Sequence, residues 1–327
     1  MRFVDSFNSY NERYIRLLKK HYELEFVDNP DFLFYGPYGK GWEHNLFSSC
    51  IKICMCSEGV FPDYNECDYG IGSFPLLIGN NRYFRVPYVA PTKEFQKNEH
   101  ADPFYDDRLF CNFVYSNPDR GEGALLRQEF CRELMKYKKV DCPGRVLNNM
   151  QITFANRSDA NWRTSKIEFM KKYKFTICFE NAVQEGMVSE KILDAFLARS
   201  IPIYWGAPDV DDLYNQEAFI NCNEITNISE MVKRVIEIDQ DKEKYKEMVS
   251  CNPVNREFNW DWEKDLEEYL QYIIESGTQL RRDPLHYDSG IKAASILSEL
   301  DEKKWYKLYK KTKQLKERII HKYEQRR

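Results

Sequence analysis

Residues 174–196 read KFTICFENAVQEGMVSEKILDAF, and this stretch decides the fold. An apolar run ends at Glu180, and an apolar pattern with a period of about 3.6 residues resumes at Ile192, which predicts a buried strand followed by an amphipathic helix. Ser189 stands at the position of the helix N-cap. A second apolar run, IPIYWG, follows at residues 201–206. This order predicts two parallel neighbouring strands joined by a right-handed crossover.

The segment between the strand and the helix is unusually polar. It carries Glu180, Asn181, Ser189, Glu190 and Lys191. In a right-handed crossover these groups converge on the rim formed by the carboxyl ends of the strands, where open α/β sheets bind ligands and helix N-termini attract phosphate. We therefore expect a phosphate-bearing ligand here. The alternative is that Ser189 only caps, Glu190 only favours the helix dipole and Lys191 is solvated.

The rest of the chain repeats the alternation of strands and helices. A length of 327 residues exceeds the usual ~100–200 residues of one domain, and the predicted elements fall into two α/β halves. We expect an N-terminal α/β domain at 1–107, a second α/β domain at 108–255, returning helices at 256–300 and a separate tail at 301–327. The fold class is α/β, with a parallel sheet in each half and a cleft between the halves.

The tail differs in charge from the rest of the chain. Residues 301–327 hold eleven Lys or Arg against four Asp or Glu, a balance of +7 in a chain whose net charge is −4. Trp305, Leu308, Leu315 and Ile319 recur on one helical face, which is typical of an interfacial membrane helix. A helix that packs on this protein or on a partner helix has the same pattern.

Composition limits the compartment and the chemistry. The sequence has no uninterrupted apolar run of ~18 residues and no apolar core of a signal peptide at its start, so we expect a cytoplasmic protein whose ten cysteines are reduced. Cys50, Cys54 and Cys56 lack a second ligand pair at metal-finger spacing, and we interpret CIKICMC as a strand. No metal site and no nucleic-acid partner is expected.

Nearly forty positions carry a resemblance to a known family. Residues 173–210, YKFTICFENAVQEGMVSEKILDAFLARSIPIYWGAPDV, closely resemble the donor-binding signature of the α-1,3/4-fucosyltransferases, especially the bacterial ones. The resemblance extends upstream to SEGVFPDYNECDYGIGSF, NRYFRVPYV and FVYSNP. It implies the GT-B fold, with two facing Rossmann-like domains, and transfer of L-fucose from GDP-β-L-fucose with inversion.

The resemblance assigns cations to the departing pyrophosphate. Lys191 occupies the position of the family's phosphate-contacting Lys, and Arg127 resembles the family's phosphate-contacting Arg, with Arg120 as the rival. Fixed cations can neutralise the negative charge of the leaving group, as a metal ion does in other transferases. We expect no cofactor and no coordinated metal, although stimulation by a divalent ion is compatible with this assignment.

The remaining donor-side residues follow from the same resemblance. Glu190 matches a family Glu near the sugar and is assigned a catalytic, charge-stabilising role. Glu180 and Asn181 are assigned to shaping the loop that binds the donor. Ser189 replaces a family Thr and keeps the hydroxyl. Met187 replaces a family Tyr, so any contact made by that ring is lost.

Inverting transfer in one displacement needs a general base for the acceptor hydroxyl. Glu58 in SEGVFP matches the family's base, and Asp63 is the runner-up. The alternative for Glu58 is an exposed loop carboxylate. Asp209 and Asp211 form an Asp-x-Asp pattern, which we interpret as acids at a helix start rather than as metal ligands.

The predicted reaction is transfer of L-fucose to O3, with O4 as the alternative, of GlcNAc or Glc in lactosamine- or lactose-type acceptors, including lipid-linked glycans. Such products are of the Lewis-antigen type. Two other functions stay open: an inverting GT-B transferase with another nucleotide sugar, and a non-catalytic scaffold at a membrane. With any of these functions, the tail at 301–327 would hold the protein at the inner face of the cell membrane.

Overall fold

The computed structural model describes residues 1–6, 8–56, 60–76, 81–89, 107–119, 121–151, 161–255, 257–258, 260–280, 284–303, 307, 309 and 311–313. Side chains are left out at residues 8–10, 284–291 and 302. The described residues cluster into two compact units. Unit 1 comprises Met1–Gly72, Leu77–Phe84 and Glu263–Arg327, and unit 2 comprises Ser73–Leu76 and Arg85–Trp262.

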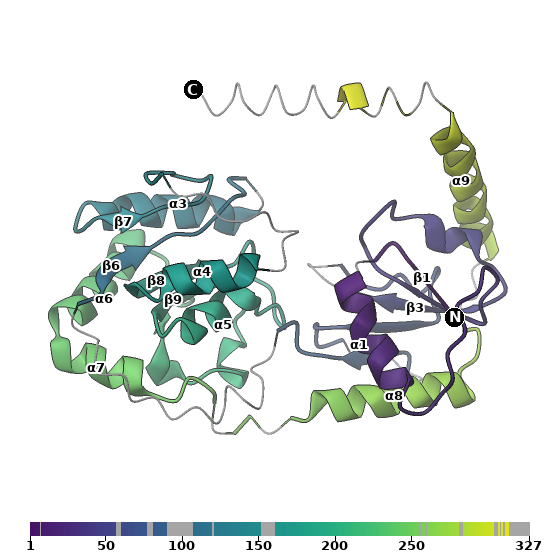
Figure 1. The fold of residues 1–327 in the computed structure, drawn as a ribbon, viewed down its shortest axis with the longest axis horizontal. Coiled ribbons are helices and arrows are strands. Elements are labelled where there is room, and N and C mark those ends of the chain that lie inside the picture. Colours follow the sequence, from purple (N-terminus) through teal and green to yellow (C-terminus); the bar gives the residue numbers. More distant parts are fainter. Residues whose placement is uncertain are drawn as a thin grey trace. The chain divides into compact units, whose positions relative to one another are not determined.

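Unit 1 is built on a five-stranded sheet in the order β1-β2-β3-β4-β5. Figure 1 labels β1 and β3 of this sheet. The strands are β1 (Arg2–Val4), β2 (Phe32–Tyr35), β3 (Ile51–Met55), β4 (Tyr69–Gly72) and β5 (Tyr83–Arg85). The pairs β1–β2, β2–β3 and β3–β4 are parallel. The ring of Tyr14 in α1 (Asn8–Leu18) lies 5.8 Å from that of Phe34, so α1 covers one face of the sheet.

Two later helices complete unit 1. In α8 (Trp262–Ser276), Tyr269 stacks on Phe84 with ring centroids 4.9 Å apart, and Glu263 pairs with Arg16 of α1 at 2.6 Å. α9 (Pro284–Glu302) packs against the short helix η1 (Glu43–Leu46). Segments from both ends of the chain therefore share one core.

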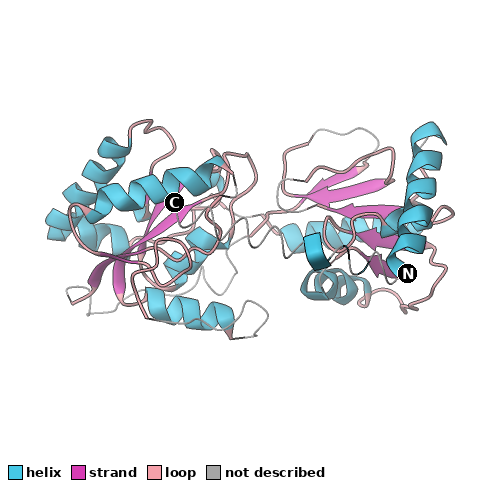
Figure 2. Ribbon diagram, turned by 90° about the horizontal axis from the view of Figure 1, so that it is seen from above, coloured by secondary structure: helices cyan, strands magenta, loops and turns pink. Residues whose placement is uncertain are grey.

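Unit 2 has a second five-stranded sheet, in the order β10-β9-β8-β6-β7, with all strands parallel. Its strands are β6 (Leu109–Asn112), β7 (Val140–Asp141), β8 (Tyr173–Phe179), β9 (Ile201–Trp205) and β10 (Ile220–Asn221). Its helices are α3 (Glu122–Met135), α4 (Trp162–Met170), α5 (Glu190–Leu197), α6 (Ile228–Gln240) and α7 (Lys242–Ser250). Figure 2 shows helices on both sides of these strands. This is a doubly wound, Rossmann-like arrangement.

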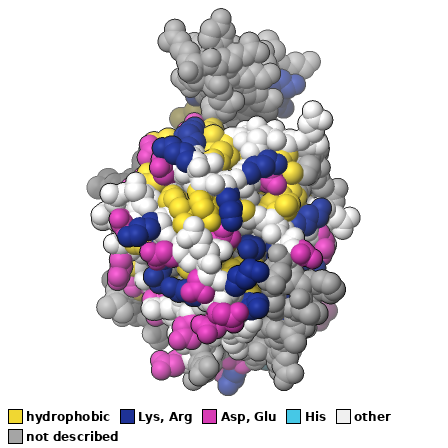
Figure 3. Space-filling model, turned by 90° about the vertical axis from the view of Figure 1, so that its left-hand side faces the viewer, with side chains coloured by type: hydrophobic (Ala, Val, Ile, Leu, Met, Phe, Trp, Pro, Cys, Tyr) yellow, Lys and Arg dark blue, Asp and Glu magenta, His cyan; other side chains and the backbone are white. Residues whose placement is uncertain are grey.

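Each face of the second sheet has its own apolar core. One core joins the sheet to α3, α6 and α7, and the other joins it to α4 and α5. β8 is central and almost entirely buried, as expected for a strand covered by helices on both faces. On the face of unit 2 in Figure 3, Lys and Arg side chains are interspersed with Asp and Glu, so neither sign dominates that face.

The two parallel α/β sheets predicted from the sequence are confirmed. The expected division near Asp107 differs from the observed units, since unit 2 takes up the chain from Arg85 and the helices after residue 262 fold onto unit 1. β2 begins at Phe32, just after Pro30, which cannot donate a ladder hydrogen bond.

Other expectations concern the cysteines and the tail. All ten cysteines lie in described ranges and are free thiols, and CIKICMC contains β3 as interpreted. Most of the tail at 301–327 lies outside the described residues. Within the described part of the chain, no helix has the length and apolarity that a membrane crossing requires.

Unit 1 contains a buried ionic cluster after β1 and β2. His44 is 4% exposed and stacks on Tyr35 at 4.0 Å. Its Nε2 lies 2.9 Å from Glu66 Oε2, and its Nδ1 lies 3.7 Å from Asp5 Oδ2. Burial alone would lower the pKa of His44, but Asp5 and Glu66 outweigh burial and raise it. Contact with His44 in turn lowers the pKa of Glu66, and contact with His44 together with three backbone N–H donors lowers that of Asp5.

We predict that the stability provided by His44 decreases as pH rises. Because the pKa of His44 is raised in the folded state, its contribution is fully present below the unfolded value of about 6.5 and is lost as pH passes through the raised pKa. The free energy of unfolding in urea, measured for the wild type and His44→Gln at about pH 6 and about pH 9, should differ more at the lower pH. An equal difference at both pH values would contradict this.

Candidate active site

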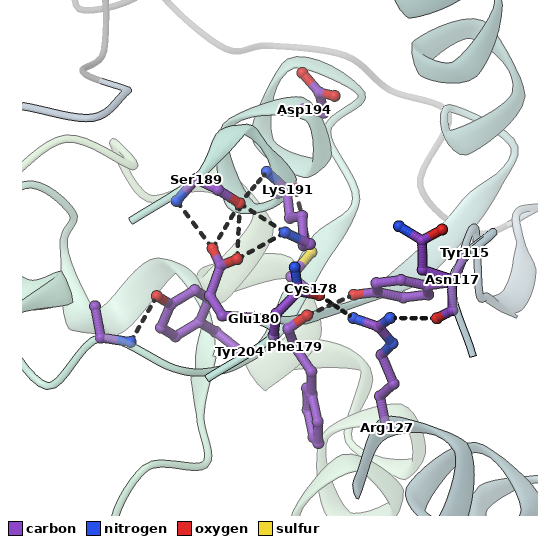
Figure 4. A network of polar contacts seen from close by, with 12 residues as sticks. Tyr115, Asn117, Arg127, Cys178, Phe179, Glu180, Ser189, Lys191, Asp194 and Tyr204 are labelled. Carbon is purple, nitrogen blue, oxygen red and sulfur yellow. Dashed lines mark hydrogen bonds and ion pairs between the residues drawn. The ribbon is translucent and has the colours of Figure 1, made fainter. Parts of the chain in front are cut away.

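The polar groups of the opening stretch meet at one rim of the second sheet. β8 ends at Phe179, which is in register with Trp205 at the end of β9, and α5 begins at Glu190 after the intervening loop. Because β8 and β9 are parallel neighbours, the end of β8 and the start of α5 lie on the same edge. The structure thus brings Glu180, Ser189 and Lys191 together, as Figure 4 shows.

Glu180 is the centre of this arrangement. Its side chain is buried, with 1% of its surface exposed. It accepts hydrogen bonds from the Ser189 N–H at 2.9 Å and from the Ser189 hydroxyl at 2.7 Å, and it pairs with Lys191 Nζ at 2.7 Å (Figure 4). A buried carboxylate is tolerated only when it is paired and hydrogen-bonded in this way.

Ser189 is the N-cap of α5, as predicted, with extended backbone and a side chain that accepts from the Lys191 N–H. Burial favours the neutral amine of Lys191, but Glu180 and Glu190 outweigh it and raise the pKa of Lys191. Its side chain keeps 18% of its surface exposed. Lys191 is therefore a fixed cation that solvent can still reach, at the positive end of a helix.

Arg127 of α3 reaches the same rim but is buried. It is 1% exposed, and its guanidinium lies 4.1 Å above the Tyr115 ring. Nη1 donates to Asn181 Oδ1 at 2.8 Å. Nη2 donates to the Asn117 carbonyl at 2.7 Å (Figure 4). Nε has no hydrogen-bond partner among the described residues. Burial lowers the pKa of Arg127, while Tyr115 and Glu180 oppose that effect.

α3 approaches the rim closely enough to require glycine. The Gly123 N–H donates to the Asn181 carbonyl at 3.0 Å, and a Cβ on Gly123 would lie 2.0 Å from the Glu180 carbonyl oxygen. Gly123, Tyr115 and Asn117 are parts of the site that were not predicted from the sequence. The glycine at the start of an otherwise regular helix was the available signal.

The remaining predicted site residues, on the acceptor side and on the donor side, are only partly described. Glu58 and Arg120 lie outside the described residues. Asp63 is exposed, and its side chain accepts from the Asn65 N–H at 2.9 Å, so its carboxylate stabilises a turn. Glu190 is half-buried as the first residue of α5.

The Asp-x-Asp pair is engaged by protein groups. Asp209 pairs with Arg85 at 2.9 Å and accepts from the Gly186 N–H, and Asp211 accepts a hydrogen bond from Gln216. Asp209 precedes a short 3-10 helix, as its interpretation as a helix-start residue requires. Within the described ranges, no three His, Cys, Asp or Glu side chains are grouped so as to hold a metal ion.

Comparisons with known proteins identify the family of the chain. Residues 108–279 match glycosyltransferase family 10 (fucosyltransferase), C-terminal part, and residues 1–90 match the N-terminal domain of alpha-(1,3)-fucosyltransferase FucT. The chain is 28% identical to alpha-(1,3)-fucosyltransferase FucT of Helicobacter pylori over 73% of its own length and 55% of the relative's. It is 30% identical to the putative fucosyltransferase R654 of Acanthamoeba polyphaga mimivirus, over 58% of its own length and 31% of the relative's. The chain thus spans about half or less of these curated relatives.

Solved structures agree on the fold. A crystal structure of an alpha1,3-fucosyltransferase superposes with a TM-score of 0.67 at 24% identity, covering 87% of this chain and 92% of that one. The crystal structure of an alpha1,3-fucosyltransferase with GDP-fucose gives 0.64, also at 24% identity, covering 86% and 91%. The GT-B fold expected from the resemblance is confirmed. From the match that covers more than half of its residues, the chain belongs to glycosyltransferase family 10, the fucosyltransferases.

Proposed function

We propose that this protein transfers L-fucose from GDP-β-L-fucose to O3, with O4 as the alternative, of GlcNAc or Glc in a lactosamine- or lactose-type glycan, with inversion. The observation that carries the proposal is the fixed cation Lys191, which Glu180 and Ser189 hold at the N-terminus of α5. Family membership and the relative named as an alpha-(1,3)-fucosyltransferase support the donor and the linkage.

The proposed donor side neutralises the leaving group. As the C1–O bond to the diphosphate breaks, negative charge grows on GDP, and Lys191 together with the α5 N-terminus stabilises it. Arg127, whose guanidinium is hydrogen-bonded to Asn181, adds a second positive charge near the diphosphate. Glu190 stabilises positive charge at the fucosyl carbon. Glu180 and Asn181 keep these groups in place, and Ser189 keeps the cap that orients Lys191.

The proposed acceptor side supplies the base. The acceptor hydroxyl oxygen attacks the fucosyl carbon from the face opposite GDP, and its proton passes to the carboxylate of Glu58. The one displacement forms the new glycosidic bond and breaks the bond to GDP, so the configuration at the fucosyl carbon is inverted. The donor needs no coordinated metal in this scheme, because side-chain cations neutralise the negative charge on the departing GDP.

The cellular setting is proposed from the sequence. A cytoplasmic enzyme with a basic amphipathic tail at 301–327 would act at the inner face of the membrane, where lipid-linked glycans are accessible. Lewis-type glycans are the products that lactosamine acceptors would give. Incubation with GDP-fucose and a panel of lacto, neolacto and lactose acceptors, followed by linkage analysis, tests donor, acceptor and linkage together. Transfer from GDP-mannose or a UDP-sugar instead would reject the proposed donor.

The first prediction from this proposal concerns Lys191. Removing one partner of a buried ion pair costs about 3–5 kcal/mol, so Lys191→Met alone would disturb Glu180. The double variant Glu180→Gln, Lys191→Met keeps a neutral hydrogen-bonding group beside Ser189, leaves no unpaired charge and removes the cation. We expect calorimetry to show GDP affinity reduced by about tenfold or more.

The matched control is Lys172→Met, which removes a Lys next to the opposite end of β8. Lys172 is exposed, and its variant should bind GDP as the wild type does. Unchanged GDP affinity in the double variant would rule out Lys191 as the diphosphate contact.

The second prediction concerns the base. Glu58→Gln should lower the rate of transfer by about 10²- to 10⁴-fold while GDP-fucose still binds, because the amide cannot accept the proton. Asp63→Asn serves as the comparison, since its carboxylate stabilises a turn. If Asp63→Asn abolishes transfer and Glu58→Gln does not, Asp63 is the base.

A further inference from the structure

We propose that Asp209, together with Arg85, positions the loop of residues 181–188 and thereby sets the affinity for the nucleotide sugar. This segment, called the donor loop below, joins β8 to α5. The inference rests on the proposed function, because it concerns the same donor site. Asp209 acts through Gly186 and is a positioning residue, since it touches the loop rather than the reacting atoms.

The base of the donor loop is closed by Glu180. The carboxylate before the loop accepts from the Ser189 N–H after it at 2.9 Å. Gly206, with φ +155°, packs directly on the Glu180 side chain, and a Cβ there would lie 2.5 Å from Glu180 Cγ. The two ends of the loop are therefore tied to each other, and Glu180 also packs against Gly206, which follows β9.

The middle of the loop is held by Asp209. The Gly186 N–H donates to both carboxylate oxygens of Asp209, at 2.9 and 3.0 Å. Gly186 has φ +79°, and a Cβ on it would lie 2.1 Å from the Ser73 carbonyl oxygen. Only glycine fits this conformation and this close approach. The donor loop is thus pinned at three points rather than only at its ends.

Arg85 completes the clamp. Its Nη2 lies 2.9 Å from Asp209 Oδ2, and its Nε donates to the Ser73 carbonyl at 3.2 Å. The Asp209 side chain is 14% exposed and the Arg85 side chain 38%, so the carboxylate is largely shielded from water while the guanidinium is still partly solvated. Residues 73, 85, 186 and 209 all belong to unit 2, although Arg85 ends β5 and Ser73 directly follows β4.

The backbone that carries Asp209 is itself rigidly held. The Gly206 N–H donates to Asn223 Oδ1 at 2.8 Å, and the Ala207 N–H donates to the Tyr204 hydroxyl at 3.0 Å. Asn223 Nδ2 returns a bond to the Ala207 carbonyl at 2.9 Å. The backbone two residues before Asp209 is therefore fixed by hydrogen bonds that do not involve the donor loop.

A clamp on this loop bears on binding because of what the loop carries. Asn181 at its start accepts from Arg127, and its end leads directly into Ser189 and the first turn of α5. Holding these groups in their bound arrangement before the ligand arrives reduces the ordering cost of binding. Loss of the clamp should therefore lower the affinity for the donor more than it lowers the rate of transfer once the donor is bound.

The test compares Asp209→Ala and Asp209→Asn with Asp212→Asn as the matched control. Asp212 is exposed and lies in the same acidic segment. We expect Asp209→Ala to raise KM for GDP-fucose by about tenfold, with kcat at saturating donor and KM for the acceptor nearly unchanged. Asp209→Asn should be intermediate, because its amide oxygen still accepts from Gly186 but does not pair with Arg85. Asp212→Asn should match the wild type.

Amide hydrogen exchange gives a readout that does not need activity. In Asp209→Ala, peptides from 181–188 should exchange faster than in the wild type while the rest of unit 2 is unchanged, and GDP should restore part of the protection. Three results would overturn the proposal. Asp209→Ala could have the same KM for GDP-fucose as Asp212→Asn, or its donor loop could exchange at the wild-type rate. It could also be impaired to the same extent in the KM for the donor, the KM for the acceptor and kcat. If the wild type neither binds GDP nor transfers fucose, the proposed function fails, and the exchange comparison still decides the clamp.

Discussion

The candidate site depends on one buried charge, the carboxylate of Glu180. At 1% exposure it is stable only because Ser189 and Lys191 satisfy it. The need to satisfy Glu180 draws the first turn of α5 over the end of β8 and places the ammonium group of Lys191 at the rim. Glu180 also anchors Gly206 and, through its carbonyl, the close approach of α3. The sheet, two helices and the donor loop thus meet around this residue.

The charges around Glu180 balance before any ligand binds. Two cations, Lys191 and Arg127, lie near two carboxylates, Glu180 and Glu190. The carboxylates raise the pKa of Lys191 against the opposing effects of burial and of Arg127. In the proposed reaction, the diphosphate competes with Glu180 for Lys191. Because the charge on the departing GDP grows along the reaction, that competition favours the transition state over the bound substrate. A cation already oriented by a carboxylate needs little reorganisation to respond.

Much of this site was predictable from the sequence, for a local reason. The periods of the apolar residues predicted β8, α5 and β9, and a serine before an apolar helix predicted the N-cap. The clamp was not predictable, because Arg85, Gly186 and Asp209 are distant in the sequence and meet only in the folded unit. The burial of Arg127 depends likewise on Tyr115 and Asn117 from another segment. Nor does the periodicity of α8 reveal that its core partner is β5.

A crystal structure of the protein with GDP bound tests the central claim most directly. The diphosphate should lie at the N-terminus of α5, with an oxygen within hydrogen-bonding distance of Lys191 Nζ and with Glu180 still bonded to Ser189. GDP bound elsewhere, with the contact between Lys191 and Glu180 unchanged at 2.7 Å, would contradict it.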